Sequence, residues 1–200
     1  MKALWIDAGN DPDWQKLAGH GIRIVYLPVT DPVADVKRRM AEIRQRKLVV
    51  GLYSAWNWLP GNDGAAFAEW THDHVSNLVP NATPSYPKVQ LDNEVHDPAQ
   101  ILAMLRRWRA LRPKQDTSWT FEGMQGGWMS PAFVSEVTSL RVRLVPQLYN
   151  GAMTQAWDSL TNARDLTKRG FPDALISPFY DAARLPVGWD GFCFTQGRLP

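Results

Sequence analysis

Short apolar runs alternate with longer amphipathic stretches along most of the chain. The runs are rich in β-branched and aromatic residues and are bounded by glycine, proline and polar residues, which is typical of β-strands. The stretches between them repeat their apolar residues at the spacing of a helix. Strands that alternate with helices predict an α/β fold with a mostly parallel sheet. The expected strands are 3–8, 22–28, 48–54, 88–94, 117–122, 143–149, 174–180 and 190–196.

Five helices are expected between these strands. Two are indicated by periodicity at 63–79 and 155–169, and Gly170 is a natural stop for the second. Three more begin where a capping side chain precedes a proline in the first helical position. These three pairs are Asp31-Pro32, Asp97-Pro98 and Ser130-Pro131.

Eight strands predict a single domain over 1–200, folded as a small, irregular (β/α)8-type TIM barrel. Only the segment Asp181–Trp189 separates the last two strands, whereas a parallel crossover usually needs about a dozen residues or more. That link is therefore a loop, or the last strands are antiparallel. The chain ends at Pro200, directly after the eighth strand, so we expect the last helices of the barrel to be missing.

Charge and cysteine content exclude several classes of protein. The chain has 22 basic and 20 acidic residues, a balance that predicts no nucleic-acid or membrane partner. The arginines at 106, 107, 109 and 112 are expected to form the solvated face of a helix. A single cysteine, Cys193, excludes an internal disulfide and a cysteine-based metal cluster, and no cofactor is expected. The N-terminus has no apolar signal-peptide core and no run is long enough to span a membrane, so we expect cytoplasmic synthesis.

Acidic side chains follow the strands where a barrel would gather them. The fourth strand ends in Asp92-Asn93-Glu94, and residues two apart on a strand point to the same side. Asp7 is the second-last residue of the first strand, and Glu122 ends the fifth. The carboxyl ends of barrel strands share one rim, and paired carboxylates are what sugar hydrolysis requires. These four acids are the candidate catalytic residues, although the alternative for Asp7 is a cap on the turn that follows it.

Aromatic and amide side chains follow the same strand ends. Flat rings can stack on sugar rings, and amides can satisfy sugar hydroxyls. The alternative for any of the ten tryptophans is a place in the core. The candidate substrate-binding residues are Tyr53, Trp56, Trp58, Trp128, Gln147, Tyr149, Asn150, Tyr180 and Gln196.

The segments 91–94 (Leu-Asp-Asn-Glu) and 5–7 (Trp-Ile-Asp) resemble the family-25 glycoside hydrolases, the lysozyme-type muramidases often encoded by phages and their hosts. The segments 148–150 and 194–196 are similar to later positions of that family. Two segments depart from it. The family usually has Trp-Gln where this chain has Thr-Gln at 195–196, and Asp-x-Ser where this chain has Asp-Ala-Gly-Asn at 7–10.

The resemblance implies roles for the acids. Glu94 would be the general acid, with a pKa raised by burial and by the Asp92 charge. Asp92 would stabilise the positive charge at the anomeric carbon or orient the acetamido group of the substrate, and Asp7 would assist from the opposite wall. Glu122 lies outside the family pattern and is a candidate to replace one of these acids.

Two functional hypotheses follow. The first is a glycoside hydrolase that cleaves an N-acetylated polysaccharide such as peptidoglycan. The second is a non-catalytic carbohydrate-binding or structural component of a phage tail or capsid, built on a degenerate hydrolase scaffold, because a barrel does not imply activity. A polysaccharide ligand is expected in both cases and virion assembly partners only in the second. Release by lysis or incorporation into a phage particle is compatible with the expected lack of a signal peptide.

Overall fold

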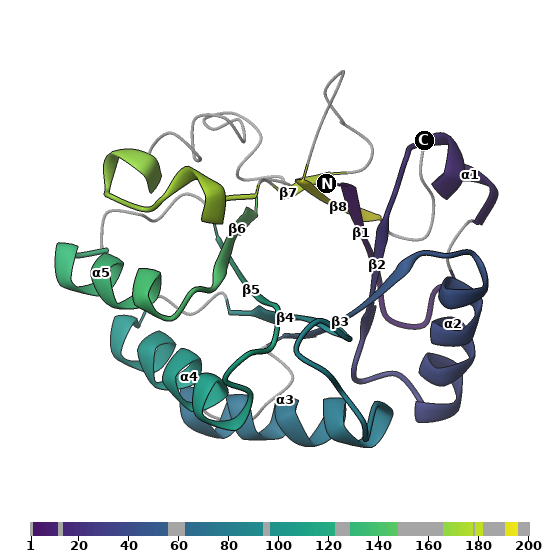
Figure 1. Cartoon of the computed structure of the whole chain (residues 1–200), viewed down its shortest axis with the longest axis horizontal. Coiled ribbons are helices and arrows are strands. Elements are labelled where there is room, and N and C mark those ends of the chain that lie inside the picture. The colour runs from purple at the N-terminus through teal and green to yellow at the C-terminus, as the bar shows by residue number, and fades with distance from the viewer. Residues whose placement is uncertain are drawn as a thin grey trace.

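The computed structural model describes residues 2–11, 14–55, 63–93, 97–122, 129–147, 166–177, 179–181 and 191–195. Eight strands form a closed barrel in chain order, and every neighbouring pair is parallel (Figure 1). Strand pairing between the first and last strands closes the ring. The strands are β1 (Lys2–Ile6), β2 (Ile24–Pro28), β3 (Val49–Ala55), β4 (Lys88–Asp92), β5 (Thr117–Glu122), β6 (Arg143–Gln147), β7 (Phe179–Asp181) and β8 (Gly191–Thr195).

The parallel sheet and the alternation of strands and helices are therefore confirmed. The alternative of antiparallel final strands is wrong, because β7 pairs with β8 in parallel. The expected strand 174–180 is also largely wrong. Asp173–Leu175 forms a short 3-10 helix that begins with a turn bond from the Leu175 N–H to the Pro172 carbonyl, and β7 starts only at Phe179.

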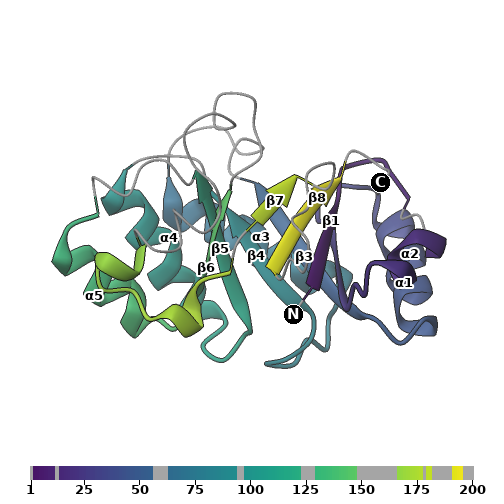
Figure 2. The ribbon, with the colours of Figure 1, turned by 90° about the horizontal axis from the view of Figure 1, so that it is seen from above.

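Helices cover the outside of the barrel in Figure 1, where α2 to α5 follow one another around β2 to β6. Figure 2 views the same ring of strands from another side, with helices at both flanks. Most of the expected helix 155–169 and all of 182–190 lie outside the described residues, so the expectation that the last helices are missing stays a prediction. The described α-helices are α1 (Trp14–Gly19), α2 (Val33–Gln45), α3 (Gly64–Leu78), α4 (Pro98–Leu111) and α5 (Pro131–Ser139).

Alternation along the strands divides the apolar residues between two cores. Leu4 and Ile6 of β1 belong to the large outer core between the barrel and its helices. Ala3 and Trp5 of the same strand belong to a smaller core inside the barrel, together with Ile24, Tyr26, Tyr53 and Val145. A Cβ at Gly51 would overlap the Tyr26 ring, so glycine at this position leaves room for a tyrosine inside the barrel.

Two of the three predicted helix caps are confirmed. The Asp97 carboxylate accepts hydrogen bonds from the backbone N–H groups of Ala99 and Gln100, and the Ser130 hydroxyl accepts one from Phe133. The predicted cap at Asp31 is wrong, because α2 has no side-chain cap. The Asp31 carboxylate is used in tertiary contacts, which are described with the site below.

The prediction of a solvated arginine face on α4 is half right. Arg106 and Arg107 form exposed ion pairs with Glu136 of α5 and Glu69 of α3. Arg109 instead donates to the carbonyls of Leu140 (2.8 Å) and Gln115 (2.6 Å), and Arg112 donates to two side chains of α3. These two guanidiniums satisfy groups at the ends of neighbouring elements, so they join α4 to its surroundings.

Candidate active site

Asp7 and Asp92 lie at the same rim of the barrel. Asp7 directly follows β1, and Asp92 is the last residue of β4. Because all eight strands are parallel, both residues stand at the carboxyl ends of their strands, where enzymes of this architecture place their chemistry.

Tyr53, near the end of β3, connects the two acids electrostatically. Its pKa is raised, first by burial and then by the negative charges of Asp7, Asp92 and Asp31. Charges that raise one phenol's pKa must lie near it, since water and salt screen distant charges. Asp7 and Asp92 therefore both contribute to the electrostatic environment of Tyr53 at this rim, and the catalytic roles expected for the two acids stay predictions.

The Tyr53 side chain is fixed in the barrel. Its hydroxyl donates a hydrogen bond to the Ile6 carbonyl at 3.0 Å. Its ring stacks on Trp5 with centroids 4.0 Å apart and planes inclined by 16°. Both rings are 3% exposed, so Trp5 covers one face of the ring predicted to contact substrate. Substrate binding by Tyr53 stays a prediction.

A neutral hydrogen-bonded layer lies beneath Asp92. Gln90, two residues earlier on β4, accepts a hydrogen bond from the Trp5 indole N–H and donates one to the Thr120 hydroxyl of β5. Gln90 and Thr120 are completely buried, and Asp92 is 7% exposed. The amide thus joins three strands inside the barrel and holds the strand end that carries Asp92. The backbone N–H of Asn93 extends this attachment by donating to the Thr120 carbonyl at 2.9 Å.

Asp7 also has the turn role that was its alternative interpretation. Its carboxylate accepts a hydrogen bond from the Ala8 N–H at 2.9 Å, and its carbonyl accepts one from the Asn10 N–H at 3.1 Å. Its side chain is half-buried. The turn therefore fixes the direction of the carboxylate at the rim.

A buried ion pair holds this turn against α2. The Arg39 guanidinium pairs with Asp31 and donates a hydrogen bond to the Asn10 carbonyl at 2.8 Å. The Asp31 carboxylate accepts from the Gly9 N–H at 3.1 Å. Asp31 is 8% exposed and Arg39 is 2% exposed. The pair positions the backbone of residues 9–10, directly after Asp7.

Sequence reasoning missed Gln90, Arg39 and the site role of Asp31. Gln90 offered a detectable signal, because it lies two residues before Asp92 and so shares its face of the strand. Arg39 offered none, since it is one of several cations in an amphipathic helix. Asp31 was misread because an aspartate before a proline is also a common helix-start pattern.

The side chains of the remaining predicted site residues are not described. Glu122, Gln147 and Tyr180 are described in their backbone only. Glu122 pairs in register with Gln147 at the ends of β5 and β6. Tyr180 pairs with Cys193 in β8. The residues outside the described ranges are Glu94, Trp56, Trp58, Trp128, Tyr149, Asn150 and Gln196.

The part of the chain that the structure describes contains no group of three histidine, cysteine or acidic side chains arranged to hold a metal ion. None of the helices described there is long and apolar enough to cross a membrane.

The chain matches no protein-family model and no curated protein in sequence. It is similar in structure to the catalytic domain of a hyperthermophilic chitinase from Pyrococcus furiosus, with a TM-score of 0.63 and 16% identity over 96% of this chain and 75% of that one. It is also similar to catalytic-site mutants of active domain 2 of a chitinase from the same organism (TM-score 0.62, 16% identity, 90% of this chain and 71% of that one). A mutant form complexed with chito-oligosaccharides gives a TM-score of 0.61 at 15% identity, over the same shares of the two chains. At this level of identity the likeness establishes only a shared fold, the barrel of these chitinase catalytic domains.

Proposed function

We propose that this protein is a glycoside hydrolase that cleaves an N-acetylated polysaccharide. The observation that carries the proposal is that Asp7 and Asp92 stand at the ends of separate strands on the same carboxyl rim of the closed barrel. The fold shared with chitinase catalytic domains supports it, since one of those proteins was captured with chito-oligosaccharides.

In this proposal Glu94 is the general acid that protonates the leaving oxygen. It follows Asp92 by two residues, and a neighbouring negative charge favours the protonated form that an acid needs at neutral pH. Asp92 stabilises the positive charge that develops at the anomeric carbon, or orients the substrate's acetamido group. Asp7 acts from the opposite wall, and Glu122, at the end of β5, is the candidate substitute for one of these acids. The aromatic and amide residues predicted at the strand ends would hold the sugar rings.

The substrate class is tested with a matched set of glycans. Wild-type protein is incubated with N-acetylglucosamine oligomers, with peptidoglycan and with deacetylated oligomers of equal length, and new reducing ends are measured. We expect cleavage of an acetylated substrate and none of the deacetylated control. Equal cleavage of the acetylated and deacetylated oligomers would contradict the proposed substrate class.

The second candidate function is non-catalytic. It is favoured by the departures from the family-25 pattern at 7–10 and 195–196, and by the use of one Asp7 oxygen in its own turn. In this case the chain binds carbohydrate or serves as a structural part of a phage particle. The protein is then either incorporated into the particle during assembly or released when the host cell lyses. Binding of acetylated oligomers by calorimetry without any cleavage would support this candidate over the enzyme.

A further inference from the structure

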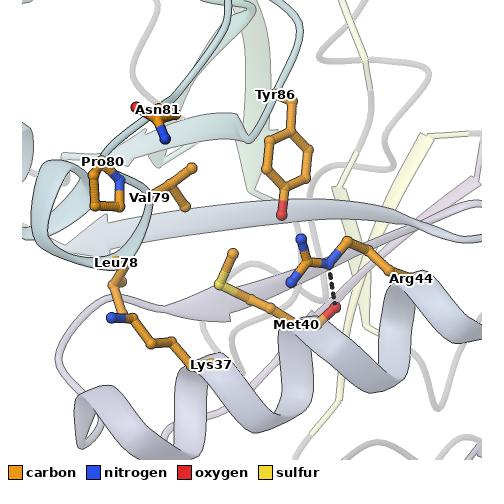
Figure 3. Close-up of a pocket in the computed structure, with 8 residues that line it drawn as sticks. All are labelled: Lys37, Met40, Arg44, Leu78, Val79, Pro80, Asn81 and Tyr86. Atoms are coloured by element: carbon orange, nitrogen blue, oxygen red, sulfur yellow. Dashed lines mark hydrogen bonds between the residues drawn. The ribbon is translucent and has the colours of Figure 1, made fainter.

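A pocket of about 420 Å³ lies in the helix layer (Figure 3). One wall is a face of α2, formed by Lys37, Met40 and Arg44. The opposite wall is the segment 78–81 at the end of α3, and Tyr86 closes the pocket from the segment that leads into β4. Its volume is in the range of small-molecule sites.

The pocket is separate from the candidate active site. In a barrel of parallel strands, the helices run back to the rim where the next strand begins. The segment 78–86 connects the end of α3 to the start of β4, and therefore lies toward the amino-terminal rim. Asp7 and Asp92 stand at the carboxyl rim, so a ligand here would not occupy the proposed sugar site.

The pocket combines an apolar floor with positive charge. Met40, Leu78 and Val79 are buried apolar residues. Lys37 and Arg44 are seven positions apart on α2, about 10.5 Å along the helix axis, and the lining includes no carboxylate. Within the described residues Lys37 has no ion-pair partner.

Tyr86 adds an unused hydrogen-bond donor beside one of these cations. The Arg44 guanidinium carbon lies 5.9 Å from the Tyr86 ring centroid, and the Arg44 Nε donates to the Met40 carbonyl at 3.3 Å. The Tyr86 hydroxyl oxygen is buried and has no hydrogen-bond partner in the part of the chain that the structure describes. Figure 3 shows this hydroxyl directed toward the guanidinium, above Met40. A buried hydroxyl without a partner is unfavourable, and an anion beside it would satisfy both groups.

We propose that this pocket binds a small organic anion with a short apolar body. The anionic group, a carboxylate or a phosphate, pairs with the Arg44 guanidinium, and a small shift of the Tyr86 side chain lets its hydroxyl donate a hydrogen bond to the same group. The apolar body lies over Met40 toward Leu78, and Lys37 contributes a second positive charge along the same wall. A neutral ligand of the same shape leaves the guanidinium without a counter-charge and binds more weakly.

The test uses three probes with a common six-carbon body: hexanoate, hexyl phosphate and hexanamide. Each is titrated into the full chain while backbone amide shifts are followed by NMR. We expect hexanoate or hexyl phosphate to shift the amides of 78–86, with an affinity at least about tenfold above that of hexanamide, because a charged partner strengthens the hydrogen bonds. The tighter of the two anions identifies the head group.

Tyr86→Phe isolates the hydroxyl while keeping the ring. We expect it to weaken anion binding about tenfold, as loss of one charge-assisted hydrogen bond does, while the melting temperature does not fall. Arg44→Gln is expected to weaken binding at least as much. Arg23→Gln is the matched control, since Arg23 is exposed and does not line the pocket, and its affinity should equal that of the wild type.

Three results would overturn the proposal. They are equal affinity for hexanamide and the two anions, unchanged affinity in Tyr86→Phe, and no shift of the 78–86 amides at millimolar anion. None of these measurements depends on glycan cleavage, so the pocket and the proposed hydrolase activity can fail independently.

Discussion

At the scale of single residues, the candidate site depends on side chains that hold strand ends and turns. The Arg39–Asp31 pair is the clearest case, because it is buried and also bonds the backbone of Gly9 and Asn10 in the turn after Asp7. Gln90 has the same function beneath Asp92, with neutral partners. The acids are therefore positioned by residues that need not contact the substrate.

Removing the arginine from the buried pair should be costly. Arg39→Met leaves the Asp31 carboxylate buried without its counter-charge, which destabilises a protein by about 3–5 kcal/mol. Arg38→Met, one position earlier, removes an arginine whose side chain is 47% exposed, and should cost much less because water screens exposed ion pairs. Urea unfolding of the two variants measures the difference. Equal losses would show that the buried pair has no special role.

At the scale of elements, the close packing of α3 against α4 depends on a glycine at the start of α3. Gly64 begins α3, and its N–H donates to the Gln100 side-chain carbonyl at 2.9 Å. A Cβ at Gly64 would overlap the backbone carbonyl of Gln100. Glycine is required here by the distance between the helices rather than by backbone conformation.

Gly64→Ala should therefore destabilise the fold. Overpacking of this kind costs about 1–3 kcal/mol, and more when the obstructing atom is backbone. Gly19→Ala, at the end of α1, is the control, because a Cβ there meets nothing within 4 Å. We expect that control to change stability by less than about 1 kcal/mol. Thermal or urea unfolding tests both, and a neutral Gly64→Ala would contradict the packing described here.

The same pair of helices should respond to acid. Arg112 of the α4 C-terminus donates to the His72 Nδ1 atom at 3.1 Å, which requires a neutral imidazole. Burial and the Arg112 charge lower the His72 pKa below its usual value. The unfolded chain then takes up this proton first, so stability should fall as pH drops below about 6.5, the ordinary histidine pKa, and level off below the folded-state pKa.

Unfolding free energies measured at pH 7.5 and pH 5.5 test this effect. The loss on acidification should be smaller in His72→Gln than in the wild type. His20→Gln controls for removal of an imidazole elsewhere in the chain. An identical pH dependence in His72→Gln and the wild type would mean that this contact does not respond to protonation.

At the scale of the whole molecule, the barrel could be predicted because each strand and helix has its own pattern of apolar residues in a short stretch of sequence. Strand and helix periodicities recur along the chain, and strands 117–122 and 143–147 lie where the pattern placed them or within its bounds. The seventh strand could not be placed, because an apolar run with prolines at 172 and 178 is compatible with a turn or a strand. The spacing of Asp92 and Glu94 came from the sequence alone, as did the rim that Asp92 shares with Asp7.

The rest of the site depends on contacts between distant segments. Arg39 reaches a turn twenty-nine residues away, and Trp5 reaches Gln90 eighty-five residues away. Contacts between residues so far apart in the sequence produce no periodic pattern of residues. These partners are brought together by the closing of the barrel. The pocket between α2 and Tyr86 has the same origin.

The central proposal is that Glu94 acts as the general acid of glycan hydrolysis, assisted by Asp92 and Asp7 at the carboxyl rim. Its most direct test is the initial rate of cleavage of an N-acetylated hexasaccharide by the wild type, Glu94→Gln and Glu69→Gln, the last removing an exposed surface acid. We predict that Glu94→Gln lowers the rate by at least about a hundredfold, as loss of a general acid does, while Glu69→Gln leaves it unchanged. A wild type that cleaves no acetylated glycan, or a Glu94→Gln variant as fast as the wild type, would contradict the account.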